Sequence, residues 1–257
     1  MEKTAAEVLV NNDIYDTLGE RWYSAFDDPV ALLRAESKLR NPWILKVIRS
    51  HLGGTNGDST SPLKVLDVGC GGGFLTNFLA LNGLDVTGVD QSSASLHIAH
   101  RHDATGRVCY KDADAAKLPY GDASFDVVCA MDFLEHVEDP MALIKEMARV
   151  LKPNGIFFFH TFNRNVIAWL VIIKFVEWFV KNTPKNMHIL RLFIKPEEMT
   201  KGCEAAGLTV QEVLGTRPIV FRWSVLKGLL RRTVAQDFGF EFTPSTLLSY
   251  SGYAVKR

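Results

Sequence analysis

One stretch decides the fold of this chain: Val65-Leu66-Asp67-Val68-Gly69-Cys70-Gly71-Gly72-Gly73-Phe74. Its first residues form an apolar run that is short enough for a buried strand. The glycines that follow permit a tight turn in which the backbone comes close to a ligand, and apolar residues then recur at helical spacing up to Leu81. The pattern predicts a strand, a turn and a helix, with a ligand held at the turn.

A second predicted strand, Asp85-Val86-Thr87-Gly88-Val89, leads into Asp90. Asp90 follows the first glycine of the loop at roughly the 20-residue spacing at which a strand-end carboxylate accepts the two hydroxyls of a ribose. The glycine loop and Asp90 together predict a crevice that binds a nucleoside.

The spacing of the glycines distinguishes two kinds of nucleoside cofactor. A dinucleotide site has the pattern G-x-G-x-x-G and places a pyrophosphate at a helix N-terminus. Here Gly69 and Gly71 belong to a nearly contiguous cluster that Asp67 precedes. A carboxylate favours a cation, and S-adenosylmethionine (SAM) carries an ammonium and a sulfonium. The pattern D-x-G-x-G-G followed by Asp90 resembles the class I methyltransferase signature, and a nicotinamide enzyme is the alternative.

Strands and helices alternate along the chain after the glycine loop, which implies a parallel sheet. The expected fold class is α/β: a Rossmann-like class I methyltransferase fold with a mostly parallel, seven-stranded sheet flanked by helices. An N-terminal helical cap and a helical insertion after the fifth strand complete it. Helices are predicted over residues 92–102, 140–151 and 196–206, and strands over residues 108–110, 125–130, 156–162, 209–214 and 249–255.

The composition is that of one elaborated domain. The chain has 257 residues, 47% of them hydrophobic, which is enough for one sizeable core. Lys+Arg and Asp+Glu balance at 29 each, so no nucleic-acid partner is expected. The cysteines lack metal-binding spacing and are expected to be reduced thiols of a cytoplasmic protein. No signal peptide is apparent at the N-terminus. The cysteines are Cys70, Cys109, Cys129 and Cys203.

The N-terminal part is predicted to be helical. Residues 8–51 are helix-prone, with one helix ending near Asp27 and a second over Val30–Leu52. These helices form either a plain cap on the sheet or a lid over cofactor and substrate, and we favour the lid. A polar connector, residues 53–62, follows. The expected division is a cap and linker at 1–62 and a SAM-dependent methyltransferase domain at 63–257.

A short acidic turn follows the strand at residues 108–110. In a methyltransferase, Asp112 would accept a hydrogen bond from the adenine amine of SAM, and the backbone of Ala113 would meet the adenine ring. The alternative is an ordinary solvated turn.

The segment Met131-Asp132-Phe133-Leu134-Glu135-His136-Val137 follows a predicted buried strand and so lies at the carboxyl edge of the sheet, where ligands bind. Asp132, Glu135 and His136 stand at i, i+3 and i+4, which places them on one face of a helical turn. Two carboxylates and an imidazole suit Mg²⁺. The alternative is that Glu135 and His136 position the cofactor or act as a base.

Several motifs resemble the ubiquinone-biosynthesis O-methyltransferases, over about residues 10 to 200. They include the glycine loop and the Glu135-His136-Val137 turn, and the others are Arg21-Trp22-Tyr23, Asn41-Pro42, Asn163-Arg164-Asn165, Pro184-Lys185, His188 and Phe193-Ile194-Lys195-Pro196. The resemblance implies SAM-binding roles for Gly69, Asp90 and Met131, and Mg²⁺ ligation by Asp132, Glu135 and His136.

The chain departs from this family at some positions. Glutamate is usual where Asp132 stands, and the arginine expected shortly after Asn41-Pro42 is missing, so Arg40 is taken as its substitute among the cofactor-binding residues. The resemblance implies O-methylation of a phenol or catechol hydroxyl on a polyprenylated quinone precursor similar to 3-demethylubiquinol. Phenols titrate near ~10, so Mg²⁺ would favour the reactive phenolate, with His136 as the competing general base. Two further interpretations are a methyltransferase of another lipid or secondary metabolite and a noncatalytic membrane-associated protein.

One apolar segment, residues 166–181, is too short and too interrupted by Lys174 and Glu177 to span a bilayer. Trp169 and Trp178 flank it as interfacial aromatic residues do. We expect an insertion at about 163–195 that contacts membrane lipids, on the inner face of a membrane; a buried helix is the alternative. The cations that suit anionic headgroups are Arg164, Lys174, Lys181 and Lys185, with a further basic segment at 222–232.

Overall fold

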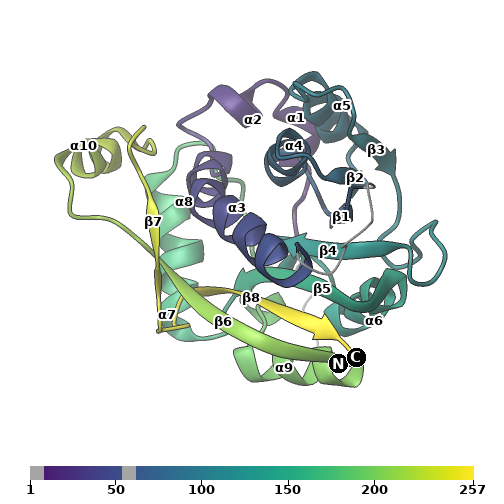
Figure 1. Cartoon of the computed structure of the whole chain (residues 1–257). Helices are drawn as coiled ribbons and strands as arrows, with labels where there is room; N and C mark the ends of the chain where they lie inside the picture. Colours follow the sequence, from purple (N-terminus) through teal and green to yellow (C-terminus); the bar gives the residue numbers. More distant parts are fainter. Residues whose placement is uncertain (1–8, 54–61) are drawn as a thin grey trace, which may run out of the picture.

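A computed structural model of the chain describes residues 9–53 and 62–257. Within these residues the strands form one eight-stranded sheet in the order β3-β2-β1-β4-β5-β8-β6-β7 (Figure 1). The α/β class and the mostly parallel sheet are confirmed. The strands are β1 (Lys64–Val68), β2 (Asp85–Asp90), β3 (Cys109–Asp112), β4 (Phe125–Met131), β5 (Leu151–Phe162), β6 (Leu208–Pro218), β7 (Phe240–Thr243) and β8 (Ser249–Lys256).

The sheet has one strand more than the seven predicted. Strands β1 to β5 are parallel, and β8 enters antiparallel between β5 and β6. The additional strand is β7, which pairs antiparallel with the end of β6 at the edge of the sheet. Strand β6 continues to Pro218, beyond the predicted end at residue 214, because pairing with β7 extends it.

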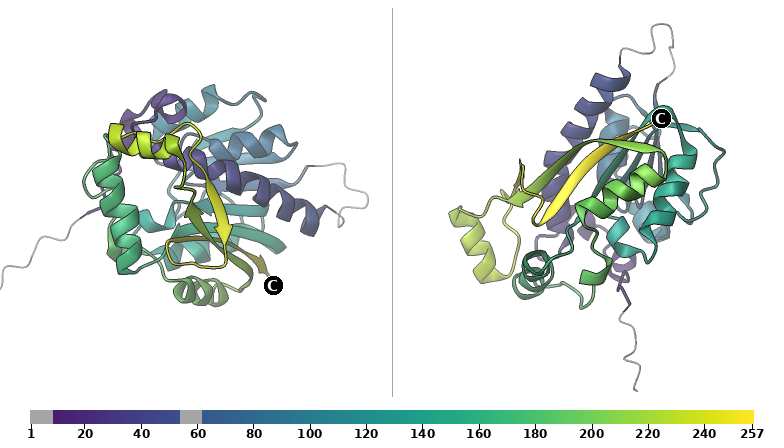
Figure 2. Two further views of the ribbon diagram at one scale, coloured as in Figure 1. Left: turned by 90° about the vertical axis from the view of Figure 1, so that its left-hand side faces the viewer. Right: turned by 90° about the horizontal axis from the view of Figure 1, so that it is seen from below.

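Helices cover both faces of the sheet (Figures 1 and 2). The main helices are α3 (Val30–Leu52), α4 (Phe74–Leu81), α5 (Ser93–Arg101), α6 (Pro140–Val150), α9 (Pro196–Ala205) and α10 (Trp223–Arg231). The shorter ones are α1 (Ile14–Thr17), α2 (Arg21–Ser24), η1 (Leu134–His136), α7 (Val166–Ala168), η2 (Trp169–Phe175), α8 (Val176–Phe179) and η3 (Leu190–Leu192).

A hydrophobic core lies on each face of the sheet, and the side chains of β5 alternate between the two cores. Phe157 and Phe159 point to one face and join residues of α6 and α9, whereas Ile156 and Phe158 point to the other and join residues of α3 and α4. Successive strand side chains lie on opposite faces, so a continuous apolar run is what a strand buried on both sides requires.

Helix boundaries follow the predicted caps. At the start of α5, the Ser92 hydroxyl accepts a hydrogen bond from the backbone N–H of Ser95. At the start of α6, the Asp139 carboxylate accepts a hydrogen bond from the backbone N–H of Ala142, and Pro140 stands in the first turn. The second predicted N-terminal helix is confirmed as α3. The segment before it forms two separate short helices, α1 and α2, because Gly19 between them has a positive φ of 51°.

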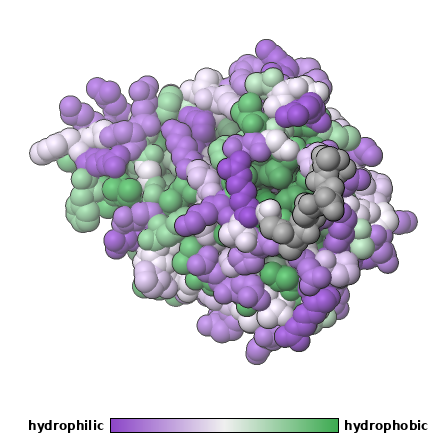
Figure 3. Space-filling model, in the orientation of Figure 1, coloured by the Kyte–Doolittle hydropathy of each residue, from purple (hydrophilic) through white to green (hydrophobic). Residues whose placement is uncertain are grey.

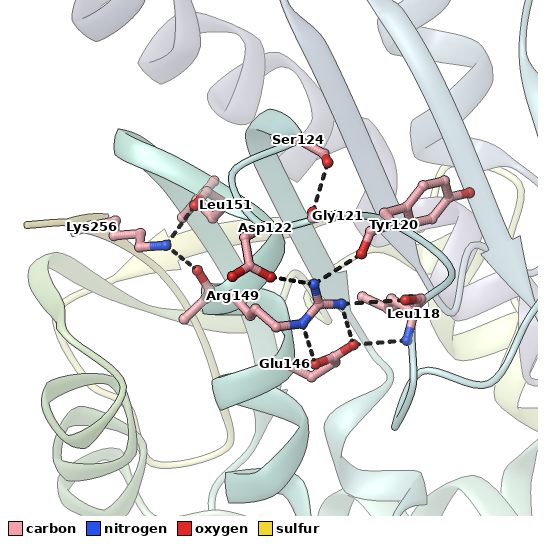
Figure 4. A network of polar contacts seen from close by, with 10 residues as sticks. Leu118, Tyr120, Gly121, Asp122, Ser124, Glu146, Arg149, Leu151 and Lys256 are labelled. Atoms are coloured by element: carbon pink, nitrogen blue, oxygen red, sulfur yellow. Dashed lines mark hydrogen bonds and ion pairs between the residues drawn. The ribbon is translucent and has the colours of Figure 1, made fainter.

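An ion-pair network holds the loop between β3 and β4 against α6 (Figure 4). Arg149 Nη2 donates to Glu146 Oε1 at 2.7 Å and Arg149 Nη1 to the carbonyl oxygen of Tyr120 at 2.9 Å. Glu146 Oε1 in turn accepts from the backbone N–H of Leu118 at 2.9 Å. Lys256 Nζ caps the C-terminal end of α6 by donating to the carbonyl oxygen of Ala148.

The predicted insertion after the fifth strand forms one continuous helical segment, residues 166–179, made of α7, η2 and α8. Its central part, η2, is wound as a π-helix. Across the described ranges, no helix has the length and hydrophobicity needed to cross a membrane.

Most of the predicted polar connector, residues 54–61, lies outside the described residues, as do residues 1–8. Helix α3 shares a core with β1 and β4, since Ile44 and Ile48 pack with Val65 and Val127. The predicted cap therefore packs directly on the sheet, and its division from a domain at 63–257 stays a prediction.

Candidate active site

A cavity of about 530 Å³ opens at the carboxyl ends of β1, β2 and β4. The glycine loop, the turn after β3 and the turn after β4 form its walls, and α1, α2 and α3 contribute residues from the N-terminal side. The predicted site residues that line it are Arg40, Asp67, Gly69, Gly71, Asp90, Ala113, Met131, Asp132 and His136.

The glycine loop folds as its sequence predicts. The backbone N–H of Gly69 donates to the carbonyl oxygen of Val89 at 2.8 Å, which joins the loop to the end of β2. Gly69 has a φ of 72°, and a Cβ there would lie 2.4 Å from the ring of Phe133. Gly72 lies against Trp22, where a Cβ would meet the indole at 2.6 Å. Only glycine satisfies both the backbone conformation and the close packing at Gly69.

Asp90 is held in place by the backbone on both sides. Its Oδ2 accepts from the N–H of Gly71 at 2.8 Å, and its Oδ1 accepts from the N–H of Ser92 at 2.9 Å. Each oxygen keeps lone-pair capacity for a further donor. Burial raises the pKa of Asp90, and these backbone hydrogen bonds counteract that effect. The arrangement presents two fixed acceptors, as two ribose hydroxyls require.

Asp67 lies beneath the glycine loop and is buried. Burial, and then the nearby charges of Asp90 and Asp132, raise the pKa of Asp67 to about 8. A cation in the cavity would favour ionisation of this carboxyl, because an opposite charge offsets the cost of desolvation.

The turn after β3 places its acidic residues differently from the prediction. Asp112 accepts from the hydroxyl of Ser93 at 3.0 Å on the outside, and it is Asp114 that lines the cavity together with Ala113. Asp112 still belongs to β3, paired with Asp90, and the chain turns towards the cavity only after it. Asp112 therefore does not line the cavity as expected, and the acidic residue of this turn that does so is Asp114.

Arg40 reaches the site from α3, although it is buried. Its Nη1 donates to Asp132 Oδ1 at 2.9 Å, and its Nη2 donates to Asp132 Oδ2, so the pair is bidentate. Burial opposes ionisation of Asp132, but the Arg40 charge, the neighbouring His160 and the hydrogen bonds from Arg40 together hold the pKa of Asp132 below its usual range. Asp132 has a left-handed backbone, with a φ of 55°, which turns the chain after β4.

Two buried residues that the sequence does not single out complete this cluster. His160 Nε2 lies 3.5 Å from Glu36 Oε1 and 3.4 Å from Asp132 Oδ1. Burial and the Arg40 charge lower the pKa of His160 to about 3, so it is neutral. Glu36 and His160 come from α3 and β5, and no sequence motif links them.

Glu135 does not face the cavity. It is fully buried, and its Oε2 accepts from the hydroxyl of Thr161 at 2.9 Å. Among the described residues its Oε1 finds no hydrogen-bond partner. Burial, followed by the charge of Asp132, raises the pKa of Glu135, which favours the neutral acid.

His136 lines the cavity beside a second histidine. Its ring lies 5.1 Å from that of His188 and 6.0 Å from that of Tyr15. Burial lowers the pKa of His136 to about 4, so its imidazole is neutral at pH 7. Its Nδ1 lies 3.1 Å from Asn12 Oδ1, an atom that only accepts, so Nδ1 carries the proton and Nε2 keeps a free lone pair.

The predicted magnesium ligands do not converge in this arrangement. Within the described ranges, one group of donor atoms lies within 4.8 Å of one another, and it consists of Glu36, Asp132 and His160. The set Asp132, Glu135 and His136 is not such a group. Both Asp132 oxygens bind a buried guanidinium, which already supplies the positive charge, and Glu135 is turned into the core. These residues do not fit Mg²⁺ as placed.

Two aromatic residues of the N-terminal helices line the cavity and were not among the predicted site residues. Tyr15 and Trp22 stack at 5.7 Å between ring centroids, and Trp22 lies against the glycine loop. The sequence shows them as apolar positions at helical spacing, which does not distinguish a wall of a binding site from an ordinary core contact.

Comparison with known proteins agrees with this geometry. Residues 66–159 match the model of a family described as a methyltransferase domain. This range runs from the first strand and glycine loop to β5 and includes most of the cavity walls.

Two relatives are similar over most of the chain. A ubiquinone biosynthesis O-methyltransferase of Idiomarina loihiensis is 40% identical over 222 residues, covering 84% of each chain. One of Pasteurella multocida is 35% identical over 215 residues, covering 79% of this chain and 85% of the relative.

Among solved structures, a SAM-dependent methyltransferase from Thermotoga maritima superimposes with a TM-score of 0.60 at 17% identity. The match covers 95% of this chain and 99% of that one. At this identity the likeness concerns the fold alone.

Proposed function

The chain belongs to the ubiquinone biosynthesis O-methyltransferase family and is a SAM-dependent O-methyltransferase, and from this premise we propose its acceptor and mechanism. The acceptor is a phenol or catechol hydroxyl of a polyprenylated quinone precursor similar to 3-demethylubiquinol. The acceptor is supported by the likeness to ubiquinone biosynthesis O-methyltransferases, and the mechanism by His136, which lines the same cavity as Asp67 and Asp90.

In this proposal, SAM occupies the cavity along the glycine loop. Asp90 accepts hydrogen bonds from the ribose hydroxyls, and Asp114 accepts one from the adenine amine. Asp67 lies near the positively charged part of SAM. Gly69, Gly71, Ala113 and Met131 supply the remaining walls, and Arg40 reaches the same cavity with its guanidinium bonded to Asp132. Trp22 and Tyr15 close the cavity from the N-terminal side, which supports the lid interpretation of α1 and α2.

The methyl group moves in one displacement. The acceptor oxygen attacks the methyl carbon of the sulfonium, the new C–O bond forms as the C–S bond breaks, and S-adenosylhomocysteine leaves. The hydroxyl proton passes to His136 Nε2, whose lone pair is free because Nδ1 donates to Asn12. Glu135 does not touch the acceptor in this scheme; buried and bonded to Thr161, it holds the turn that carries His136.

Magnesium assistance stays a prediction, and the present geometry argues for base catalysis by His136 instead. For Asp132, Glu135 and His136 to bind one ion, Asp132 would have to leave Arg40 and Glu135 would have to ionise. Both changes are costly for buried groups.

Transfer of a tritiated methyl group from SAM tests the acceptor and the metal together. The acceptors are a short-chain prenylated catechol, the matching dimethyl ether and a lipid without a phenol, each with and without EDTA. Among the three acceptors, we expect methyl transfer to the catechol only, and we expect it both with and without EDTA. Absence of transfer to the catechol would overturn the acceptor. Loss of transfer in EDTA with rescue by Mg²⁺ would restore the metal interpretation.

We also propose that the helical segment 166–179 docks on a membrane, from which a polyprenylated acceptor must be collected. Its exposed side chains include Trp169, Leu170, Phe175 and Trp178, whereas Ile173 is buried. This distribution supports an interfacial helix over the fully buried alternative. The location that follows is the inner face of a cytoplasmic membrane.

Flotation with anionic vesicles tests this docking. We expect the wild-type protein to float and the variant Trp169→Glu, Phe175→Glu to stay in the soluble fraction. If both stay in the soluble fraction, the membrane part of the proposal fails and the acceptor part is untouched.

A further inference from the structure

Helix α10 carries an apolar face that nothing in the described protein covers. Trp223 is 79% exposed and Leu230 is 82% exposed, and Leu226 lies on the same side. Phe221, just before the helix, is 99% exposed. The opposite side of α10, with Val225 and Gly228, is buried.

The chain directly after α10 is attached to the end of the helical segment 166–179. Arg232 Nε donates to the carbonyl oxygen of Trp178 at 3.0 Å, and the backbone N–H of Lys181 donates to the carbonyl oxygen of Arg232 at 3.1 Å. Val234 and Val180 share an apolar cluster with Ala31 of α3. These contacts hold the C-terminal end of α10 beside the helical segment 166–179.

Helix α10 and the insertion helix lie at the same end of the molecule. Figures 1 and 2 show α10 beside α8 in separate views. Figure 3 shows apolar side chains gathered at this end, below a fringe of hydrophilic ones. We call the exposed apolar residues of these two neighbouring helices, together with Phe221, the docking surface. Its residues are Trp169, Leu170, Phe175, Trp178, Phe221, Trp223, Leu226 and Leu230.

The charged residues on α10 and directly beside it in sequence are all positive, and one acidic side chain, Asp237, lies at the start of the helix, 3.8 Å from Arg222 and away from Lys227 and Arg231 in sequence. Residues 219–235 contain Arg222, Lys227, Arg231 and Arg232 and no acidic residue. Lys227 and Arg231 are exposed beside Trp223 and Leu230 on the helix. An amphipathic helix with tryptophan and leucine on one side and cations at its margin suits the interface of an anionic bilayer. A buried contact with another protein would more commonly pair such cations with acidic residues.

We propose that α10 is a second membrane-docking helix, which inserts Trp223, Leu226 and Leu230 into the acyl boundary of an anionic bilayer while Lys227 and Arg231 meet the headgroups. The inference rests on the proposed use of a membrane-borne acceptor. Two helices joined through Arg232 and Trp178 would orient the enzyme on the bilayer, whereas one helix alone would leave it free to roll about its axis.

The test compares single glutamate substitutions at exposed leucines in the full-length protein. Leu230→Glu lies on the docking surface, and the matched control Leu81→Glu lies on α4, where Leu81 is 62% exposed. Flotation uses vesicles of phosphatidylcholine with and without one quarter phosphatidylglycerol. We expect Leu230→Glu to weaken binding to the anionic vesicles by about tenfold or more, and Leu81→Glu to bind as the wild type does.

Three further measurements distinguish membrane docking from misfolding and from self-association. Methyl transfer to a water-soluble catechol without vesicles should be unchanged in Leu230→Glu, which reports on folding and on the proposed reaction independently of docking. Lys227→Glu, Arg231→Glu should abolish the preference for phosphatidylglycerol. Equal flotation of Leu230→Glu and wild type would overturn the proposal. So would a wild-type dimer in solution that Leu230→Glu converts to a monomer, since the face would then be an interface between copies of this chain.

Discussion

At the scale of single residues, the cavity is an acidic site. Asp67 and Asp90 both lie in its wall, and burial raises the pKa of each. Two carboxyls that are costly to ionise alone become favourable partners for a ligand that brings hydroxyl donors and a positive charge. SAM brings both.

Asp90→Ala should weaken SAM binding at least tenfold. Each charge-assisted hydrogen bond to a ribose hydroxyl contributes about 1.5–3 kcal/mol, and the variant removes two acceptors. Asp85→Ala, at the exposed start of the same strand, is the matched control. Calorimetric titration measures both affinities, and an unchanged affinity in Asp90→Ala would refute the ribose assignment.

Asp67→Asn should change how stability depends on pH. The pKa of Asp67 is higher in the folded than in the unfolded chain, so its carboxyl favours folding below pH 4 and loses that contribution as pH rises through about 8. An asparagine at this position does not ionise, so the variant does not lose stability in this way as pH rises. We expect Asp67→Asn to gain about 1 kcal/mol or more over the wild type between pH 5 and pH 8.

Urea unfolding of both proteins without cofactor measures this difference, and taking the difference cancels the other titrating groups. A constant gap between the two proteins over this pH range would show that Asp67 is already ionised in the cofactor-free protein.

His136 should stay neutral well below pH 6. Its folded pKa of about 4 lies below the ordinary histidine value because burial disfavours the charged ring. Histidine-labelled protein, with His136→Gln to assign the signal, allows an NMR titration. The surface residue His97 is the internal control. A titration midpoint near pH 6.5 for His136 would mean that its ring is more exposed to solvent than the structure indicates.

At the scale of elements, the loop between β3 and β4 depends on α6. Arg149 bonds Glu146 on its own helix and backbone oxygens of the loop, and that loop begins at the cavity wall. Helix α6 thereby holds the loop (Figure 4), which begins at the part of the cavity wall formed by Ala113 and Asp114.

Arg149→Ala should lower the Tm by about 2–4 °C, which corresponds to roughly 1 kcal/mol in a domain of this size, because solvent screens part of the ion pairs. Lys145→Ala, an exposed position on the same helix, should leave the Tm unchanged. Differential scanning calorimetry gives both values. Equal values for Arg149→Ala and wild type would mean that the network adds no net stability.

At the scale of the whole molecule, the cavity lies between the sheet and the N-terminal helices, so a ligand there contacts both. SAM at a hundredfold excess over its Kd should therefore add about 2.7 kcal/mol and raise the Tm by roughly 5–10 °C. Hydrogen exchange should slow in α1 and α2 as well as in the glycine loop. Slowing in the loop alone would contradict a lid role for α1 and α2.

The sequence by itself determined the fold class and the cofactor loop, because these depend on local patterns. The run from Val65 to the glycines encodes a buried strand and a turn, and Asp90 follows at a spacing set by one helix and one strand. The caps at Ser92 and Asp139 are likewise local, and the structure confirms them. The additional strand β7 was not predictable, since it is short and depends on pairing with β6.

Only the tertiary structure decided what surrounds Asp132. The spacing of Asp132, Glu135 and His136 suggested three ligands on one face, but a left-handed backbone at Asp132 and the core contact of Glu135 separate them. The partner of Asp132 is Arg40, 92 positions away in the chain. Sequence spacing reports neighbours within one turn of helix, whereas buried charges are satisfied by whichever segments the fold brings together. The exposed apolar side of α10 could not be predicted for the same reason, because the exposure of a side chain depends on how the whole chain packs.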